Sequence, residues 1–489
     1  MPEKQSKVSS ERNKTKKKKR IRSYPIIVLS VFYICLTLAL LIYIGNYAYS
    51  NRQTLLNNSY NTRQQILLSQ NSRGRIYSRN GDVLAYTGKD ENGKDKRIYP
   101  YGKEFAHVVG YSTNGKMGIE SQANYYLINT SIDLSDKVTY DTAGEKYPGD
   151  SVYSTLDVKL QEVAYNALSA RKGAIIVSDP RTGEILAMVS KPDFEPNTIA
   201  QDWSSLIADK SPDAKLLNRA TQGLYPPGST FKIVTALAYL KDNAGKYSDY
   251  KYTCNGKYTY DGNTISCFHG ENHGYLDFAG AFAKSCNSAF ADIGLSVSRK
   301  TFGNTLSALM FNSELPISGS YSQSKAHIDE DSSYDDVMQL SIGQGATGVT
   351  PIHMNMITNA VANKGILMKP MLITGVKSED GKDVESFSKE SYKRLMTAEE
   401  AQTLKEMMEQ VVLNGTASKL KGLSYTAAGK TGSAEFNTNT SDSHAWFTGF
   451  APVENPEISV TIIVEDAGSG GSYAVPIAKR IFDAYFGME

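Results

Sequence analysis

The segment from Tyr225 to Lys232 holds the residues of this chain that are best suited to covalent chemistry. It reads Tyr-Pro-Pro-Gly-Ser-Thr-Phe-Lys, and the apolar run 233–240 follows it. The prolines and the glycine predict a turn, and the apolar run predicts a helix that is buried on nearly all sides. Ser229 then lies at the start of this helix, with Lys232 one turn later on the same side. Because apolar surroundings lower the pKa of a lysine, Lys232 can supply the neutral base that a serine nucleophile needs.

Two further motifs strengthen this interpretation. A serine three residues before a lysine is common by chance, and a solvated lysine near a helix start would explain that pair alone. However, Ser285-Cys286-Asn287 follows an apolar stretch, and Lys430-Thr431-Gly432-Ser433 lies in a run of small residues that is typical of a strand. Three motifs in this order, in the contexts of a helix start, a loop and a strand, favour a catalytic site.

The order and spacing of the three motifs resemble the active-site motifs of the penicillin-recognising serine acyltransferases. Within that group, other segments resemble the class B penicillin-binding proteins; these are 179–184, Arg219, 342–345 followed by Thr350-Pro351, and the pedestal-like segment 73–81. Ser78 stands where that family usually has aspartate, which puts one pedestal contact in question. The resemblance implies a monofunctional peptidoglycan D,D-transpeptidase that β-lactam antibiotics acylate and inhibit, with no metal or organic cofactor.

The resemblance also implies the covalent roles. Ser229 attacks the donor stem peptide, releases its terminal D-Ala and becomes an acyl-enzyme, while Lys232 takes the serine proton. Ser285 relays a proton to the leaving amine. Asn287 holds the donor backbone and helps to position Lys232.

The third motif is expected to bind the substrate. Lys430 and the hydroxyls of Thr431 and Ser433, with Gly432 between them, are suited to the terminal carboxylate of the donor. The backbone N–H groups of Ser229 and Ser433 would form the oxyanion hole. The family more often has threonine at the position of Ser433, and serine keeps the hydroxyl.

These motifs need a scaffold that joins distant segments. Helical periodicity covers 157–168, hairpin patterns cover 174–189 and 445–464, and a helical stretch covers 475–486. Strands from both ends of this region are expected to meet in one antiparallel sheet flanked by helices. The predicted class is α+β, with the resemblance implying the transpeptidase fold shared by penicillin-binding proteins and β-lactamases.

The distribution of charge predicts a membrane anchor. Residues 24–45 form an uncharged apolar stretch of about 20 residues, enough to span a bilayer as one helix. Residues 1–23 hold ten basic and two acidic residues, a charge of +8, so the other 466 residues carry −6 of the total of +2. The positive-inside rule then predicts a single-pass protein of the bacterial cell membrane, with a cytoplasmic N-terminal tail and an extracytoplasmic body. A cleaved signal peptide would have a shorter apolar core, and basic charge confined to one end does not suggest a nucleic-acid partner.

The exported part is expected to divide near residue 155. Residues 46–155 have turn signals and short strand patterns that predict a β-containing pedestal of the dimerisation type, and 156–489 form the transpeptidase domain. The pedestal segment is too small for a glycosyltransferase. The resemblance therefore implies a polytopic membrane glycosyltransferase as partner, beside nascent peptidoglycan stem peptides as substrate, in elongation, division or sporulation.

Two other functions fit the same motifs. A D,D-carboxypeptidase or a β-lactamase-type hydrolase would share all three, although the pedestal and the anchor favour a cross-linking enzyme. A non-catalytic scaffold or β-lactam sensor would keep the fold without turnover.

The cysteines and histidines allow several interpretations. Cys254, Cys267, His269 and His273 have the spacing C-x12-C-x-H-x3-H. Zinc sites usually have their first ligand pair two to four residues apart, so the spacing disfavours zinc and we assign no metal ligand. A disulfide between Cys254 and Cys267 suits an extracytoplasmic segment better, with free thiols as the default. Cys286 is interpreted as a small buried residue.

No histidine is assigned to catalysis, because none stands in a recognisable serine-histidine-aspartate arrangement. His444 and Trp446 precede a predicted strand. A structural role is favoured over a place in the substrate groove.

Overall fold

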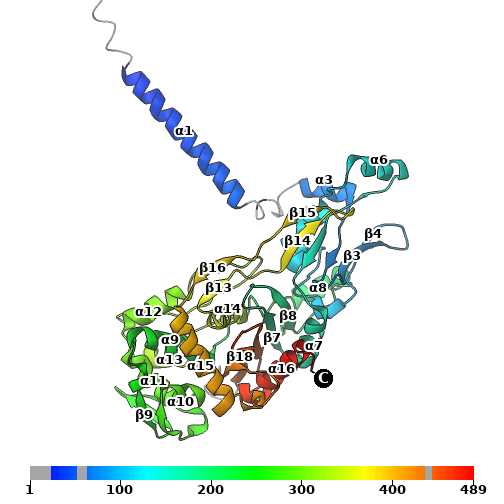
Figure 1. Ribbon diagram of the computed structural model, residues 1–489. Helices are drawn as coiled ribbons and strands as arrows, with labels where there is room; N and C mark the ends of the chain where they lie inside the picture. Colours follow the sequence, from blue (N-terminus) through cyan, green and yellow to red (C-terminus); the bar gives the residue numbers. More distant parts are fainter. Residues whose placement is uncertain (1–23, 52–54, 56–62, 436–442, 489) are drawn as a thin grey trace, which may run out of the picture. The chain divides into compact units, whose positions relative to one another are not determined.

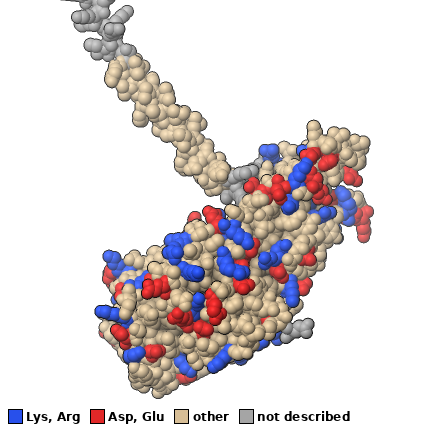
Figure 2. Space-filling model, in the orientation of Figure 1, with Lys and Arg blue, Asp and Glu red and all other residues tan. Residues whose placement is uncertain are grey.

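The computed structural model describes residues 24–51, 55, 63–435 and 443–488, in two units, 1–62 and 63–489. In the first unit, helix α1 (Tyr24–Ser50) has a mean hydropathy of 2.7 over its most apolar window. Its 27 residues extend about 40 Å at ~1.5 Å per residue, more than a ~30 Å hydrocarbon core needs. Figure 2 shows no charged side chain along it. The helix is a candidate membrane anchor, and the predicted tail 1–23 lies outside the described residues.

A five-stranded antiparallel sheet forms the centre of the second unit. Its order is β17 (Ala428–Glu435), β18 (Ser443–Ala451), β19 (Ile458–Val464), β7 (Gly173–Ser178) and β8 (Ile185–Lys191). The two predicted hairpins are β7–β8 and β18–β19, and β19 pairs with β7 so that Ser459 lies opposite Ser178. The prediction that strands from both ends of the region meet in one sheet is confirmed.

Helices cover both faces of this sheet. Helices α7 (Val158–Leu168) and α16 (Gly470–Tyr485) pack against each other and against the sheet, as Figure 1 shows. Helix α14 (Pro351–Ala362) covers the other face, towards which the alternate residues Ser459 and Thr461 point. The amide of Asn355 donates to both hydroxyls at 3.3 Å, so the polar groups in this layer are paired.

A mainly helical region lies beside the sheet (Figure 1). Its helices are α9 (Lys232–Asp242), α10 (Phe278–Ala283), α11 (Asn287–Ser296), α12 (Arg299–Ala308), α13 (Tyr334–Ser341) and α15 (Ala398–Asn414). Two small antiparallel pairs accompany them, β9 (Lys251–Cys254) with β12 (Gly274–Asp277) and β10 (Lys257–Tyr260) with β11 (Asn263–Ser266). Side-chain caps fix several starts; for example, Asp277 accepts from the Gly280 N–H at the start of α10.

A second, six-stranded sheet belongs to the predicted pedestal. Its order is β15 (Asp383–Ser386), β14 (Ile373–Lys377), β6 (Ser151–Ser154), β2 (Ile76–Tyr77), β3 (Val83–Lys89) and β4 (Asp95–Ile98). Two of its six strands therefore come from residues after 370. The predicted division at 155/156 assigns these residues to the transpeptidase domain and not to the pedestal. The predicted domain boundaries themselves stay predictions.

The remaining α-helices and β-strands of the described residues are short. They are α3 (Arg63–Gln70), α4 (Gly118–Gln122), α5 (Asn124–Ile128), α6 (Leu134–Ala143), α8 (Ile199–Ala208), the parallel pair β1 (Asn71–Ser72) with β5 (Tyr147–Pro148), and the antiparallel pair β13 (Ile366–Met368) with β16 (Ser391–Arg394).

A buried ion network holds the pedestal together. Glu120 is fully buried and binds the guanidinium groups of Arg73 and Arg97 through different carboxylate oxygens. Burial alone would raise the pKa of Glu120, but the two guanidinium charges hold it below the usual value. Arg73 also donates to the side-chain oxygen of Asn124 at 2.8 Å. The charges are therefore paired where water cannot solvate them.

Ser78, which stands where the family that the sequence resembles usually has aspartate, has local partners. The Ser78 hydroxyl accepts from the backbone N–H groups of Asn80 and Asp82 at 3.1 and 3.0 Å, and it donates to the Asp82 carboxylate at 2.6 Å. Ser78 therefore forms a side-chain turn, with the Asp82 carboxylate beside it.

We predict that Glu120→Gln lowers the free energy of unfolding by about 3–5 kcal/mol, because it leaves two buried guanidinium charges without a counter-ion. The matched control is Glu379→Gln, since Glu379 pairs with Arg75 at 3.5 Å on the surface and its loss should change the free energy by less than about 1 kcal/mol. Denaturant titration of both variants measures the difference. Equal, small losses would contradict the prediction.

Candidate active site

Ser229 lies in a single 3₁₀ turn, η2 (Gly228–Phe231), directly before α9. In a 3₁₀ turn, residues three apart are eclipsed, so Ser229 and Lys232 face the same side. Ser229 is half-buried, whereas Lys232 and the eight residues after it are all buried. The sequence predicted the serine at the helix start, and the structure places it in the 3₁₀ turn that directly precedes the helix.

Several groups from distant segments hold this turn. Gly228, with a φ of +51°, donates its N–H to the Gly343 carbonyl at 3.0 Å. A Cβ on Gly343 would lie 2.2 Å from the Gly228 oxygen, so only glycine allows this approach. The indole of Trp446 donates to the Pro226 carbonyl at 3.1 Å. The segment 342–345 and Trp446 therefore both contact the serine turn. This contact agrees with the structural role expected for Trp446.

Two residues before the turn share one carboxylate. Arg219 and the hydroxyl of Tyr225 each contact the same oxygen of Glu465 at 2.7 Å, and Arg219 is 2% exposed. Glu465 directly follows β19. No local pattern points to Glu465, because its partners lie about 240 residues earlier in the chain.

The amine of Lys232 is enclosed by the second motif. It donates to the Ser285 carbonyl at 2.6 Å and to the Asn287 side-chain oxygen at 2.7 Å, and it lies 3.3 Å from the Ser285 hydroxyl. Burial lowers the pKa of Lys232 to about 7, while Cys286 and Cys267 act in the opposite direction. Near neutral pH a large fraction of this amine is therefore uncharged.

The amine of Lys430 approaches the same serine from the other side. It donates to the Ser285 hydroxyl at 2.8 Å and to the Thr431 carbonyl at 3.1 Å. Burial and the charge of Lys232 place the pKa of Lys430 well below its usual range. One hydroxyl group is thus shared by two buried lysine amines.

The backbone of Ser285 has a conformation that usually selects glycine. Its φ is +56°, and it follows α10 at the position where a helix ends in the left-handed region. The Ser285 N–H donates to the Phe282 carbonyl at 3.1 Å and the Cys286 N–H to the Ala281 carbonyl at 3.0 Å, the pair of bonds that defines a Schellman motif. This turn directs the Ser285 carbonyl and hydroxyl towards the lysines, at the cost of some backbone strain.

The third motif lies on the edge strand β17. A Cβ on Gly432 would lie 3.0 Å from the Pro227 carbonyl, so β17 packs closely against the serine turn. Thr431 shares a hydrogen bond with the hydroxyl of Thr416, and Ser433 is half-buried and accepts the Gly470 N–H at 3.4 Å. The eight predicted site residues, which come from all three motifs, thus lie where η2 and the start of α9 meet the Ser285 turn and β17.

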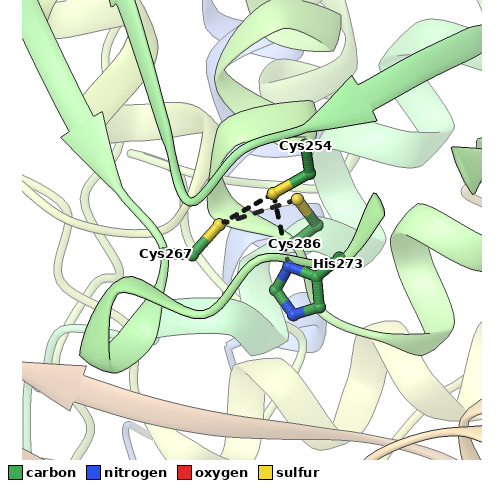
Figure 3. Close-up of side chains that lie close together, drawn as sticks. All are labelled: Cys254, Cys267, His273 and Cys286. Carbon is green, nitrogen blue, oxygen red and sulfur yellow. Dashed lines mark hydrogen bonds between the residues drawn. The ribbon is translucent and has the colours of Figure 1, made fainter. Parts of the chain in front are cut away.

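The cysteine group differs from the predicted set. The thiols of Cys254, Cys267 and Cys286 gather around the imidazole of His273, and His269 is not among them (Figure 3). The sulfurs of Cys254 and Cys267 are 3.6 Å apart, so these residues are free thiols in this structure. His444 accepts the Asp466 N–H through Nδ1 at 3.2 Å, a structural contact.

This arrangement of two serines and two lysines is typical of the serine acyltransferases that recognise penicillin. The family description "Penicillin binding protein transpeptidase domain" matches residues 173–483, and "Penicillin binding protein A dimerisation domain" matches residues 73–152. The chain belongs to the class B penicillin-binding proteins.

Individual relatives agree with this assignment. The chain is 30% identical over 455 residues to the peptidoglycan D,D-transpeptidase PbpA of Mycolicibacterium smegmatis, covering 86% of this chain and 91% of the relative. It is also 30% identical to the peptidoglycan D,D-transpeptidase MrdA of Acinetobacter baumannii, covering 79% of this chain and 65% of that protein. The resemblance seen in the sequence is confirmed.

Solved structures show the same fold. Penicillin-binding protein A of M. tuberculosis, as a ceftriaxone acyl-enzyme complex, has a TM-score of 0.77 at 27% identity over 85% of this chain and 98% of that chain. A D,D-transpeptidase domain from Eggerthella lenta has a TM-score of 0.75 at 30% identity over 86% and 99% of the two chains. The predicted α+β transpeptidase fold is confirmed.

We predict that Ser285→Gly slows acylation by a labelled penicillin by about 100-fold or more, within the range for loss of a positioned proton-transfer group. Glycine adopts the left-handed backbone without strain, so this variant removes the whole hydroxymethyl group and favours the same turn. Ser285→Ala removes the hydroxyl alone and keeps the Cβ, so the backbone strain of the wild-type serine remains. Stopped-flow acylation rates compare the two, and a near-normal rate for Ser285→Gly would show that only the backbone of Ser285 matters.

Proposed function

We propose that this protein is a peptidoglycan D,D-transpeptidase that cross-links stem peptides through an acyl-enzyme on Ser229. The observation that carries the proposal is the pair of buried amines, Lys232 and Lys430, placed around the Ser285 hydroxyl beside the serine turn. Family membership and the activity named for PbpA and MrdA support it.

In the acylation step, Lys232 acts as the base. A neutral amine has two hydrogens and one lone pair, and the contacts to the Ser285 carbonyl and the Asn287 oxygen use both hydrogens. The lone pair is left to accept the proton of Ser229 as its Oγ attacks the carbonyl of the penultimate D-Ala. The proton then passes through Ser285 to the nitrogen of the departing D-Ala, so charge is conserved when the peptide bond breaks.

The residues of the edge strand β17 are proposed to bind the donor. Lys430, Thr431 and Ser433 are the groups suited to the terminal carboxylate of the donor, with Gly432 allowing the close approach of β17 to the serine turn. The backbone N–H groups of Ser229 and Ser433 are the proposed oxyanion hole. Asn287, whose amide donates to the Ser266 carbonyl at 3.0 Å, would align the donor backbone.

The second half of the reaction transfers the acyl group to the amine of another stem peptide. A β-lactam would stop the enzyme at the acyl stage, because its ring opens on Ser229 without giving a free leaving group. Acyl-enzyme structures of M. tuberculosis penicillin-binding protein A with ceftriaxone and imipenem support this view.

Helix α1 is the proposed single-pass anchor. The basic residues before it favour a cytoplasmic N-terminus and an extracytoplasmic catalytic domain. Strand polymerisation would then come from a polytopic membrane glycosyltransferase that acts with this protein, which we propose from the small size of the pedestal segment.

We predict that the acylation rate rises with pH through a midpoint at about 7, because the neutral form of Lys232 increases as pH rises through its lowered pKa. The titratable groups around this amine are Lys430, Cys267 and Cys286. The measurement is the labelling rate against pH, corrected for spontaneous hydrolysis of the label. A rate that is constant on both sides of pH 7 would contradict the assignment of the base.

The proposed function is tested by penicillin labelling and by analysis of the reaction products. Labelled penicillin should attach to the wild-type protein and not to Ser229→Ala, while Ser204→Ala, an exposed serine of α8, should label normally. Incubation with a donor stem peptide and an amine acceptor should then give the aminolysis product. Only hydrolysis would identify a carboxypeptidase or β-lactamase, and an absence of labelling in a folded protein would identify a scaffold.

A further inference from the structure

A groove of about 350 Å³ lies between α10 and α15, and none of the eight predicted site residues lines it. The two helices pack against each other (Figure 1), and the turn η3 (Tyr247–Asp249) adds further lining residues. Pockets for small ligands occupy about 300–1,000 Å³, so this groove has the volume of a ligand site. The proposed acyl transfer gives it no role.

The lining combines aromatic rings with carboxylates. Phe278 and Met407 form its buried part and are each 3% exposed, and the centre of the half-buried Tyr247 ring lies 6.3 Å from that of Phe278. Asp277 and Glu406 add two exposed carboxylates. Carboxylates and the faces of aromatic rings both attract positive charge, whereas the apolar part suits an alkyl chain. The lining therefore favours an organic cation with an alkyl stem.

Both carboxylates can accept a further donor. Asp277 Oδ1 accepts a backbone N–H of α10 at 2.7 Å, and Glu406 Oε1 accepts a side-chain amide of α15 at 2.8 Å, which leaves the second oxygen of each group available. Lys251 lies opposite Asp277 in the β9–β12 pair, but its amine donates to the Ser248 carbonyl at 3.3 Å. Among the residues that the structure describes, neither carboxylate has an ion-pair partner.

We propose that this groove binds the protonated side-chain amine of a stem peptide. Asp277 and Glu406 are its counter-ions, and the rings of Tyr247 and Phe278 contact its alkyl chain. An alkylamine has a pKa of about 10.4, so it is charged at neutral pH and matches the two carboxylates. The preference for an organic ammonium group follows from the lining alone, whereas the choice of a stem peptide rests on the proposed function.

The bound amine is distinct from the amine that reacts. Phe278 precedes Ser285 by about two helical turns, a separation of about 10 Å. The attacking amine must also be neutral and in contact with the ester on Ser229, whereas two carboxylates stabilise the charged form. The groove therefore holds a second stem peptide while another one reacts at Ser229.

Both helices that line the groove end at the catalytic site. Helix α10 is followed by the Ser285 turn. After α15, a Cβ on Gly415 would lie 2.2 Å from the Ala283 carbonyl oxygen. The next residue, Thr416, shares a hydrogen bond of 2.5 Å with the hydroxyl of Thr431. A stem peptide held in the groove is thus kept close to the acyl-enzyme, which raises the local concentration of stem peptides there.

The test uses the full-length, detergent-solubilised protein and a stem tripeptide with an acetylated N-terminus, a free lysine side chain and no D-Ala. Isothermal titration calorimetry should show saturable binding of this tripeptide. Acetylation of the lysine amine should abolish the binding, because it removes the charge and keeps the peptide. Equal binding of the acetylated tripeptide, or no saturable binding of either, would overturn the proposal.

Variants of the two carboxylates locate the site. Glu406→Gln should weaken binding about 3- to 5-fold, as expected for the loss of an exposed ion pair. Adding Asp277→Asn, which keeps the helix cap, should weaken it about 10-fold or more. The matched control Glu399→Gln removes an exposed glutamate of α15 that does not line the groove, so it should bind as the wild type does. Equal losses in all variants, or no loss in the double variant, would overturn the proposal.

Two further measurements address the choice of ligand. Cadaverine, a free diamine, should bind more weakly than the tripeptide, and equal or tighter binding would identify a polyamine site and overturn the choice of a stem peptide. Ser229→Ala should bind the tripeptide normally while losing the penicillin label. Failure of the acyl-transfer proposal and failure of this one are therefore distinguishable.

Discussion

The active-site architecture depends on keeping two lysine amines out of water around a single hydroxyl group. An ammonium group loses its hydration on burial, and a second cation nearby adds repulsion, so both amines are driven towards their neutral forms. The acceptors that surround them are the Ser285 carbonyl, the Asn287 side chain, the Ser285 hydroxyl and the Thr431 carbonyl, none of which is a carboxylate. A carboxylate there would stabilise the charged forms and remove the base. The site is therefore built from dipoles rather than from ion pairs.

The central sheet provides the rigidity that such an arrangement requires. Strand β17 is one of the two edge strands, so one of its sides faces the serine turn and the proposed substrate site, while β18 and its neighbours fix it on the other side. Pairing of β19 with β7 closes the sheet between segments about 280 residues apart. The Arg219–Glu465 ion pair adds a link from the serine segment to the end of β19. Catalytic geometry in this protein is a product of long-range pairing.

Local patterns in the sequence predicted the motifs, the hairpins and the apolar helix after Ser229, because turn residues and periodicity act over a few residues. They could not predict contacts that depend on tertiary register. The closeness of Gly343 to Gly228, the shared carboxylate of Glu465 and the pairing of β14 with β6 each join segments that have no local relation. The cysteine cluster shows the same limit, since spacing selected His269, whereas the chain folds so that Cys286 lies beside Cys267.

The six-stranded sheet has a consequence for how this protein could be recombined with its relatives. Strand β6, which ends the pedestal segment, pairs with β2 on one side and with β14 on the other. A chimera spliced at one point near residue 155 would join a foreign β6 to the native β14, and the register of Ile373 with Ser154 would have to be matched by chance. The pedestal sheet is therefore not formed by one continuous segment of the chain. Exchanging it intact requires two segments, up to β6 and from β14 to β15, to be moved together.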